Sequence, residues 1–315
     1  MRFQSLLAAA LLLGTSPALA APVNAVASFS ILADMVKEVG GDRVAVTAIV
    51  GPNSDTHVYE PKPSDAVALK ASQVFFVNGL GFEGWQDRLV EATGFTGPIV
   101  VATDGIKTHE MVAEDHDGHA DGHDDGHDDH AEEGHHHHDG LDPHAWQSLA
   151  NGLVYVANIK AGLCKVDPDG CPVYTANADT YSAEISSLDA WVKSEVAKVP
   201  LEDRTVITSH DAFGYFAEEY GVTFLAPEGV STESEASAAD VAKLIQQVRA
   251  EHARALFMEN MSDPRLLEQI ARETGVKVGG ALYSDALSAP GESAADYLSM
   301  FRHNVGLMVP AMLGK

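Results

Sequence analysis

Histidine side chains are the groups in this chain that are best suited to bind a ligand. Three of them stand where expected strands end or an expected helix begins: His57 follows a strand at 44–50, His210 ends a strand at 204–210, and His144 precedes a helix. Ligands of α/β proteins bind in the crevice at the carboxyl ends of parallel strands, so we expect these three side chains to meet there. Neutral imidazole is a common ligand of transition metals, which makes metal capture the chemistry that the three residues predict.

Two other histidines stand in a different setting. His252 lies at the charged end of an expected helix, and His303 lies within the last amphipathic helix. Neither stands at the end of a strand, so we expect both to be surface or packing residues.

A separate segment at about 109–140 contains most of the histidines. Ten of the fifteen lie between His109 and His138, and from Glu110 to Asp142 there are thirteen acidic residues and no Lys or Arg. Such a segment cannot bury enough apolar surface to fold, so we expect a disordered loop. A purification tag explains the pattern less well, because tags stand at chain ends and lack this acidic repeat. A purely solubilising run does not need so many histidines. The repeated Gly-Asp-His pattern favours weak metal binding through His116, His119, His123, His127, His130, His135, His136, His137 and His138.

The first twenty residues have the composition of a cleavable signal peptide. Arg2 gives a positive start, residues 6–13 form an apolar run too short to cross a bilayer, and Ala18 and Ala20 frame a cleavage site. We therefore expect the mature chain to begin at Ala21. No cysteine follows the cleavage site, so we expect a soluble periplasmic protein without a lipid anchor. The formal net charge of −26 argues against nucleic acid and anionic membrane surfaces as partners.

Cys164 and Cys171 are the only cysteines, and six residues that include an Asp-Pro-Asp-Gly turn separate them. An oxidising compartment favours a local disulfide between them. Metal binding is the alternative, but zinc-thiolate sites use a second pair of ligands that this chain lacks.

The rest of the chain alternates β-rich runs with helical patterns, which predicts an α/β fold with mostly parallel sheets. Strands are expected at 23–29, 44–50, 74–79, near 99, 204–210, 222–226, 255–260 and 276–282. The segments SFSILADMVKEVGG and SHDAFGYFAEEYGV resemble each other and suggest two similar lobes, at 21–173 and 201–315.

One long linker helix is expected between the lobes, at 174–200. Its apolar positions keep helical spacing at Tyr181, Ile185, Leu188, Val192 and Val196. About 26 residues at 1.5 Å each make a helix near 39 Å long. Such a helix resists wide hinge motion, so we expect only modest closure of the lobes on binding.

Six segments occur in the order that one protein family uses: THVYEPKPSD, the acidic histidine-rich loop, DPHAW, SHDAFGYFAEEYG, FMENMSDPRLLEQIARETGVKV and YSDALS. Over nearly the whole mature chain, the sequence resembles the ABC-transporter solute-binding proteins for zinc or manganese. The resemblance implies one ion held between two lobes and handed to an ABC permease for import. Matching motifs imply four metal ligands, which are His57, His144, His210 and Asp285.

Three imidazoles and one carboxylate form a ligand set that suits tetrahedral zinc. Manganese prefers sites richer in oxygen, and the manganese carriers of the family resemble this pattern with a glutamate where His210 stands. We therefore expect a high-affinity zinc-binding protein, with a manganese-binding member of the same family as the alternative. Carboxylates should orient the imidazoles, and the candidates are Asp142, Glu60, Glu233 and Glu259.

Two other classes of protein are alternatives to a transport protein. A zinc hydrolase would keep an open coordination position and often carries a His-Glu-x-x-His helix, which this sequence lacks, so we do not expect an enzyme. A zinc-buffering or adhesin-like protein without a transporter remains open. Besides the permease, a periplasmic metallochaperone is a candidate partner, and we expect a monomer.

Overall fold

The computed structural model describes residues 21–109, 140–234, 236–250 and 253–315. The expected signal peptide, the nine histidines from His116 to His138, and His252 all lie outside these ranges. Within the ranges, no helix combines the length and apolar character needed to cross a membrane.

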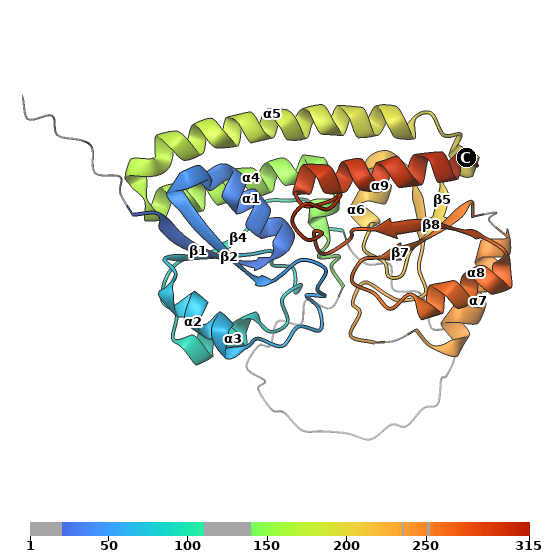
Figure 1. Ribbon diagram of the computed structural model, residues 1–315, viewed down its shortest axis with the longest axis horizontal. Coiled ribbons are helices and arrows are strands. Elements are labelled where there is room, and N and C mark those ends of the chain that lie inside the picture. Colours follow the sequence, from blue (N-terminus) through green and yellow to red (C-terminus); the bar gives the residue numbers. More distant parts are fainter. Residues whose placement is uncertain (1–20, 110–139, 235, 251–252) are drawn as a thin grey trace, which may run out of the picture.

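Two four-stranded parallel sheets form the centres of two lobes (Figure 1). The first has the order β2-β1-β3-β4 and consists of β1 (Val23–Phe29), β2 (Val44–Val50), β3 (Val74–Val77) and β4 (Ile99–Val101). The second has the order β6-β5-β7-β8 and consists of β5 (Thr205–Ile207), β6 (Thr223–Leu225), β7 (Ala255–Glu259) and β8 (Lys277–Leu282). In both sheets the first strand along the chain lies between the second and the third. This shared order confirms the prediction of two similar α/β lobes.

Helices cover both faces of each sheet. The first lobe contains α1 (Ser30–Gly40), α2 (Pro63–Ala71), α3 (Gln86–Thr93) and α4 (Leu149–Val166), and the second contains α6 (Gly214–Tyr220), α7 (Ala238–Ala250), α8 (Arg265–Thr274) and α9 (Tyr297–Met312). Figure 1 shows α2 and α3 below the first sheet and α7 and α8 below the second. The helices α6 and α8 end at Gly221 and Gly275, whose φ angles of 68° and 76° are accessible mainly to glycine.

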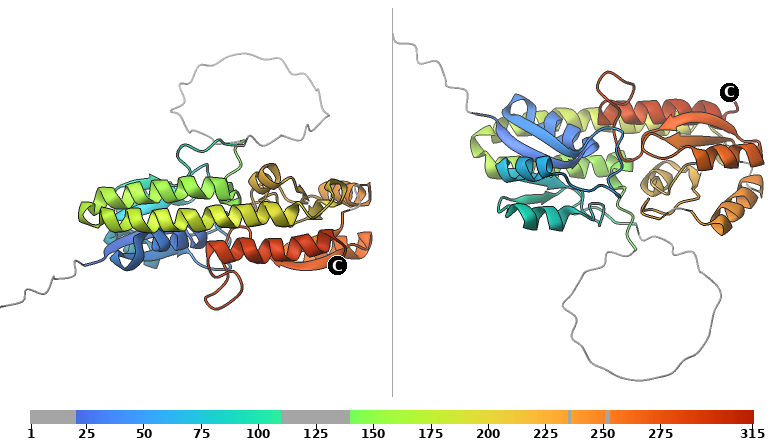
Figure 2. Two further views of the ribbon diagram at one scale, coloured as in Figure 1. Left: turned by 90° about the horizontal axis from the view of Figure 1, so that it is seen from above. Right: turned by 60° about the horizontal axis from the view of Figure 1, so that its bottom comes forward.

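A single helix, α5 (Cys171–Val196), extends over both lobes (Figures 1 and 2). It packs against α1 and α4 of the first lobe and against α6 and α9 of the second. All five apolar positions that predicted it are buried: Tyr181, Ile185, Leu188, Val192 and Val196. The helix starts three residues before the expected Tyr174, because Pro172 fits its first turn, where no backbone N–H is needed. It ends at Val196 and not at residue 200, since the chain turns there toward Pro200.

Cys164 at the end of α4 and Cys171 at the start of α5 form a disulfide. The 3-10 turn Pro168–Gly170 connects the two helices beside it. The predicted pairing is confirmed, and the bond joins the ends of two helices that pack against each other.

The apolar core continues from one lobe into the other. One cluster of buried side chains includes Phe76 of β3, Leu188 of α5 and Phe213 ahead of α6. Polar contacts follow the same path, since the Tyr297 hydroxyl of α9 donates to the carbonyl of Trp146 in the first lobe at 2.6 Å. The two lobes are therefore packed against each other, and the candidate site residues lie between them.

Candidate metal site

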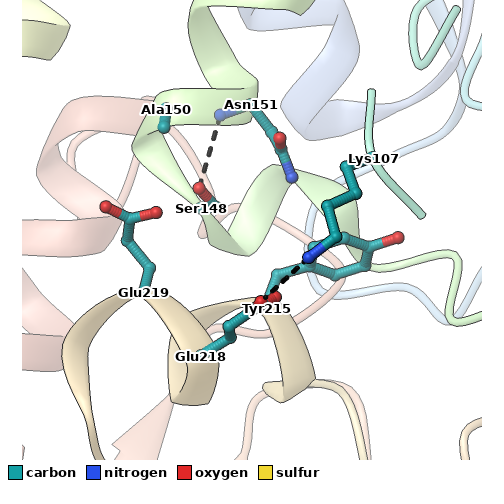
Figure 3. A pocket seen from close by; sticks show the side chains of 7 residues that line it. All are labelled: Lys107, Ser148, Ala150, Asn151, Tyr215, Glu218 and Glu219. Atoms are coloured by element: carbon teal, nitrogen blue, oxygen red, sulfur yellow. Dashed lines mark hydrogen bonds and ion pairs between the residues drawn. The ribbon is translucent and has the colours of Figure 1, made fainter. Parts of the chain in front are cut away.

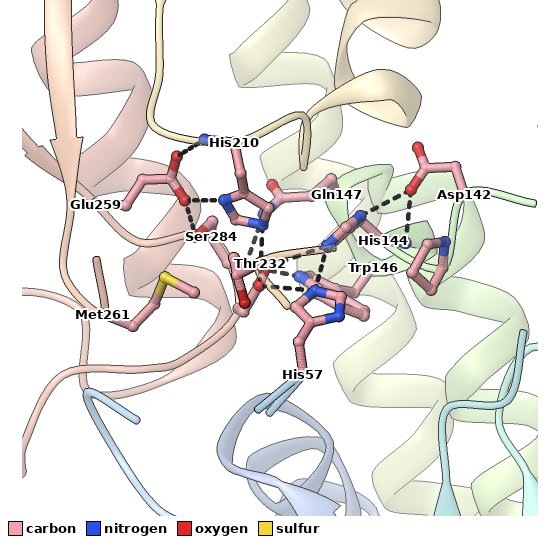
Figure 4. A network of polar contacts seen from close by, with 12 residues as sticks. His57, Asp142, His144, Trp146, Gln147, His210, Thr232, Glu259, Met261 and Ser284 are labelled. Carbon is pink, nitrogen blue, oxygen red and sulfur yellow. Dashed lines mark hydrogen bonds and ion pairs between the residues drawn. The ribbon is translucent and has the colours of Figure 1, made fainter. Parts of the chain in front are cut away.

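The four predicted ligand residues come together where the two lobes meet (Figure 4). His57 lies in the loop between β2 and α2, and His144 immediately precedes the 3-10 turn that leads into α4. From the second lobe, His210 follows β5 and Asp285 follows β8. Each lobe thus contributes two side chains, as the sequence resemblance implied.

The separations between these side chains fit one shared ion. The Nε2 atoms of His57 and His144 lie 3.3 Å apart, and Asp285 Oδ2 lies 3.1 Å from His210 Nε2 and 3.5 Å from His57 Nε2. Asp285 Oδ1 lies 3.5 Å from His144 Nε2. Atoms at the corners of a tetrahedron around zinc, each about 2.0–2.2 Å from the metal, are about 3.3–3.6 Å from one another. The four groups could therefore hold a single tetrahedral ion.

The site is closed from solvent. His144, His210 and Asp285 are fully buried, and only His57, which is 8% exposed, has any contact with solvent. Aromatic rings surround the cluster, and the ring of Phe82 contacts both His57 and His144 edge-on. The four side chains are thus enclosed by the protein almost completely.

Two carboxylates fix the orientation of two imidazoles. Asp142 Oδ1 accepts from the backbone N–H of His144 at 2.9 Å and from its Nδ1 at 2.8 Å, which turns Nε2 toward the cluster. Glu259 Oε2 lies 2.7 Å from His210 Nδ1, and Oε1 accepts from the backbone N–H groups of Ser209 and His210 at 2.7 and 3.0 Å. Metal-binding histidines commonly place the other ring nitrogen against a carboxylate in this way.

This use of the backbone also explains why β5 is shorter than predicted. The sequence predicts a strand through His210, whereas β5 ends at Ile207. The N–H groups of Ser209 and His210 donate to Glu259 instead of to a neighbouring strand. The isolated bridge between His210 and Glu228 uses the carbonyl of Ser209 and the N–H of Asp211. The early end of the strand is what turns the His210 side chain into the site.

The remaining candidates from the sequence lie elsewhere. Glu60 and Glu233 are exposed and contact none of the three imidazoles, so the orienting carboxylates are Asp142 and Glu259. His303 is partly exposed, and its Nε2 donates to the carbonyl of Ala281 at 2.9 Å, which agrees with its predicted packing role.

Contacts that the sequence does not indicate hold the two lobes together at the site. The side chains of Trp146 and Gln147 both donate to the carbonyl of Ser284, at 2.8 Å each, and so fix the backbone next to Asp285. Thr232 of the second lobe donates to Asp55 of the first at 2.7 Å. Asp55 stands two residues before His57, a weak signal for an accessory role, whereas nothing in the sequence singles out Thr232.

The electrostatics of the cluster favour an ion pair between imidazole and carboxylate. Burial alone would lower the pKa of His144, but the charge of Asp285 and the contacts with Asp142 outweigh it and raise the pKa to about 9. Burial likewise opposes the charge on His210, yet Glu259 and Asp285 raise the pKa of His210 well above its usual value. Burial would raise the pKa of Asp285, but His210 and His144 hold it well below its usual value. A cation is thus strongly favoured beside Asp285.

A separate pocket of about 410 Å³ lies between the start of α4 and α6 (Figure 3). Its lining includes Lys107, Tyr215 and Glu218, and Lys107 and His109 both pair with Glu218. The lysine already neutralises this carboxylate, so the pocket does not extend the metal site. Within the described residues, the four-ligand cluster is the one group of three or more potential ligands that could hold an ion.

Comparison with known proteins identifies the family. The profile described as "ZnuA: Zinc-uptake complex component A periplasmic" matches residues 25–311. The chain is 32% identical over 289 residues to the manganese-binding lipoprotein MntA of Halalkalibacterium halodurans, a match that covers 91% of this chain and 87% of MntA. It is 28% identical over 304 residues to the iron-binding protein YfeA of Yersinia pestis, covering 96% of this chain and 91% of YfeA.

The fold is likewise similar to a solved structure. The periplasmic zinc-binding protein TroA of Treponema pallidum superposes with a TM-score of 0.81 at 26% identity, covering 93% of this chain and 99% of TroA. The two-lobed architecture with its long linker helix is therefore a TroA-like fold.

The relatives also correct one prediction from the sequence. MntA and three further relatives are named lipoproteins, which implies attachment to a membrane through a lipid. The expectation of a free periplasmic protein without a lipid anchor was therefore wrong. It depended on one local feature, the absence of a cysteine after Ala20.

Proteins of this family are the solute-binding components of metal transporters, not enzymes, and they deliver metal to an ABC permease. The match over residues 25–311 and the meeting of four potential ligands between two α/β lobes agree on one assignment. This chain belongs to the ZnuA family of periplasmic metal-binding proteins of ABC transporters.

Proposed function

We propose that this chain binds one zinc ion with high affinity between its lobes, through His57, His144, His210 and Asp285, and delivers it to an ABC permease for import. The observation that carries the proposal is the convergence of three imidazoles and one carboxylate, buried and from both lobes. Their ligand atoms all lie within 4.8 Å of one another, and four of the contacts between them measure 3.1–3.5 Å. Zinc accepts this tetrahedral set without a preference for additional oxygen ligands.

The division of the ligands between the lobes gives the ion a mechanical role. An ion that contacts His57 and His144 on one side and His210 and Asp285 on the other stabilises the closed arrangement by its greater affinity for that state. A permease that recognises the closed arrangement would thereby distinguish loaded from empty protein. Release then requires the lobes, or the loops that carry the ligands, to separate.

Manganese is the second candidate, because MntA is named a manganese-binding protein and is 32% identical to this chain. The donor set argues against it. Mn²⁺ favours oxygen-rich coordination, and three of the four donors here are nitrogen. Histidine at position 210, where the manganese carriers of the family resemble this chain but have glutamate, is the residue that makes the ligand set favour zinc.

Competition between the two metals tests the proposal. Purified chain from which residues 115–139 have been deleted is stripped of metal and titrated calorimetrically with Zn²⁺ and Mn²⁺. We expect one tight zinc equivalent and manganese binding at least about 100-fold weaker, in line with the preference of nitrogen ligands. In His210→Glu the difference between the zinc and manganese affinities should become smaller. Manganese binding as tight as zinc in the unmodified site would overturn the zinc proposal and support the manganese alternative.

A further inference from the structure

A short segment of the second lobe, residues 228–232, connects the two halves of the metal site, and we call it the strap. At its start it is attached to the backbone around His210. The N–H of Glu228 donates to the carbonyl of Ser209 at 3.4 Å, and the N–H of Asp211 donates to the carbonyl of Gly229 at 3.2 Å. The strap therefore moves with the ligand His210.

The other end of the strap reaches across to the first lobe. The hydroxyl of Thr232 donates to Asp55 Oδ2 at 2.7 Å, and the other oxygen, Asp55 Oδ1, accepts from the backbone N–H of His57 at 2.9 Å. One carboxylate thus connects the strap to the ligand His57. Figure 4 shows Thr232 in the same network as the three histidines.

The position of this contact matters because of the pattern of exposure. His144, His210 and Asp285 are fully buried, whereas His57 is 8% exposed. The shortest way out for an ion therefore leads past His57, and the loop that carries His57 must move to open it. The contact between Thr232 and Asp55 opposes that movement.

A second contact holds the beginning of the same loop. The amide of Asn260 donates to Asn53 Oδ1 at 2.8 Å, and the N–H of Asn53 donates to the carbonyl of Leu287 at 2.9 Å. These contacts do not involve the strap. Losing the Thr232 hydroxyl should therefore free the His57 end of the loop while the Asn53 end stays attached to the second lobe.

We propose that the Thr232–Asp55 hydrogen bond is a latch that sets the rate at which the bound metal leaves. Thr232 is a positioning residue, since it acts through Asp55 and the His57 loop and not on the ion. The inference rests on the proposed function, because it takes zinc at the four-ligand site as the cargo. Under this proposal, one contact between the lobes controls the rate of zinc release.

The test measures zinc release from the loaded chain. The protein lacking residues 115–139 is loaded with one zinc equivalent and mixed in a stopped-flow instrument with a chromophoric chelator, in enough excess that the rate no longer depends on chelator concentration. In Thr232→Val, which removes the hydroxyl and keeps the shape, zinc should leave about tenfold faster, the effect expected for a hydrogen bond to a carboxylate. Thr232→Ser keeps the hydroxyl and should restore the rate to within about twofold of the unmodified protein.

Two controls separate the latch from a general loosening of the lobe. Thr223→Val makes the same change at an exposed position of β6, the strand that leads to the strap, and should leave the release rate unchanged. In a chain that carries Asp55→Ala, adding Thr232→Val should change the rate by less than about twofold, because the acceptor is already absent.

The outcomes distinguish the latch from the function on which it rests. Zinc retention with an unchanged release rate in Thr232→Val overturns the latch alone. Equal acceleration in Thr232→Val and Thr223→Val, or no restoration in Thr232→Ser, also overturns it. An unmodified chain that retains no zinc overturns both the latch and the proposed function.

Discussion

Among the single residues of this site, Glu259 connects the two ligand-bearing segments of the second lobe. One oxygen accepts from the backbone N–H groups of Ser209 and His210, and the other lies against the His210 ring and accepts from the Ser284 hydroxyl at 2.5 Å. It therefore positions His210 directly and Asp285 through the preceding residue. A buried carboxylate with four polar neighbours is well suited to this, because each contact offsets part of the cost of burying its charge.

Replacing this carboxylate should weaken binding without removing a ligand. In Glu259→Gln we expect zinc affinity to fall about 10- to 100-fold, the usual effect of losing a carboxylate behind a histidine ligand. Competition against a chelator of known affinity measures the change. Glu60→Gln is the matched control, since Glu60 is exposed and contacts none of the imidazoles. An unchanged affinity in Glu259→Gln would show that the contact with His210 has no part in binding.

Binding should also depend on pH over a higher range than ordinary histidines would give. With its pKa raised to about 9, the His144 imidazole carries a proton at pH 7 in the metal-free site, and Glu259 and Asp285 raise the pKa of His210 in the same direction. Zinc binds the neutral form, so it must displace the proton of His144, and affinity falls as pH falls below about 9. Each displaced proton changes the zinc affinity about tenfold per pH unit.

Calorimetry in buffers of different ionisation enthalpy counts the protons directly. We expect release of at least about one proton per zinc at pH 7, because His144 with its pKa of about 9 must lose its proton to bind the metal. Histidines with a pKa near 6.5 would instead release fewer than one proton in total from these two residues. Binding without proton release at pH 7 would contradict the charged state of the metal-free site.

The sequence predicts the ligands unequally. His57, His144 and His210 are recognisable because each stands at the end of a strand or the start of a helix. Asp285 also follows an expected strand, at 276–282, but an aspartate in a loop more often forms a turn or caps a helix, so this signal is weak and the family resemblance is what indicates the residue. Glu259 could not be chosen over Glu233 from the sequence, because the choice depends on which strand lies beside His210 in the folded sheet.

At the scale of elements, the linker helix is predicted from the spacing of its apolar residues, and every one of those residues is buried in α5, although both ends of the helix differ from the prediction. Strand ends are predicted unequally. The bounds of β1 and β2 match the prediction, whereas β5 stops early, where Glu259, distant in sequence, accepts from the backbone N–H groups. Local pattern therefore predicts where an element lies, while contacts from other elements decide where it ends.

A substitution within α5 tests its structural role. Leu188 is fully buried in the core that both lobes share, so Leu188→Ala should lower the free energy of unfolding by about 2–5 kcal/mol. Glu184→Ala on the exposed face of the same helix should change it by less than about 0.5 kcal/mol. Denaturant titrations of the two variants measure the difference. Equal stability would mean that α5 is not part of the cooperative core.

For the whole molecule, the sequence predicts the two lobes but not the contacts that join them at the site. The repeated α/β pattern predicts two lobes, and the strand order of the two sheets confirms their similarity. The contacts that join the lobes at the site were not predictable, because Trp146 and Gln147 meet Ser284 only after both lobes have folded and docked. A network of this kind leaves no periodic signal in the sequence.

The histidine-rich segment should add capacity and not affinity. Deleting residues 115–139 removes nine histidines that are not among the four proposed ligands. We therefore expect the deletion to lower the total number of zinc ions bound and to slow loading when zinc is scarce, while one tight site remains. Metal analysis after dialysis against excess zinc measures the number of ions bound, and stopped-flow loading at limiting zinc measures the rate. Loss of tight binding would show that histidines of the segment complete the principal site.

The central claim is that one zinc ion is held by four named side chains, and anomalous X-ray diffraction at the zinc edge tests it most directly. Crystals of the zinc-loaded chain without residues 115–139 should show one strong anomalous peak. It should lie about 2.0–2.2 Å from the Nε2 atoms of His57, His144 and His210 and from one oxygen of Asp285. A peak elsewhere, or one that lacks any of these four contacts, would contradict the account.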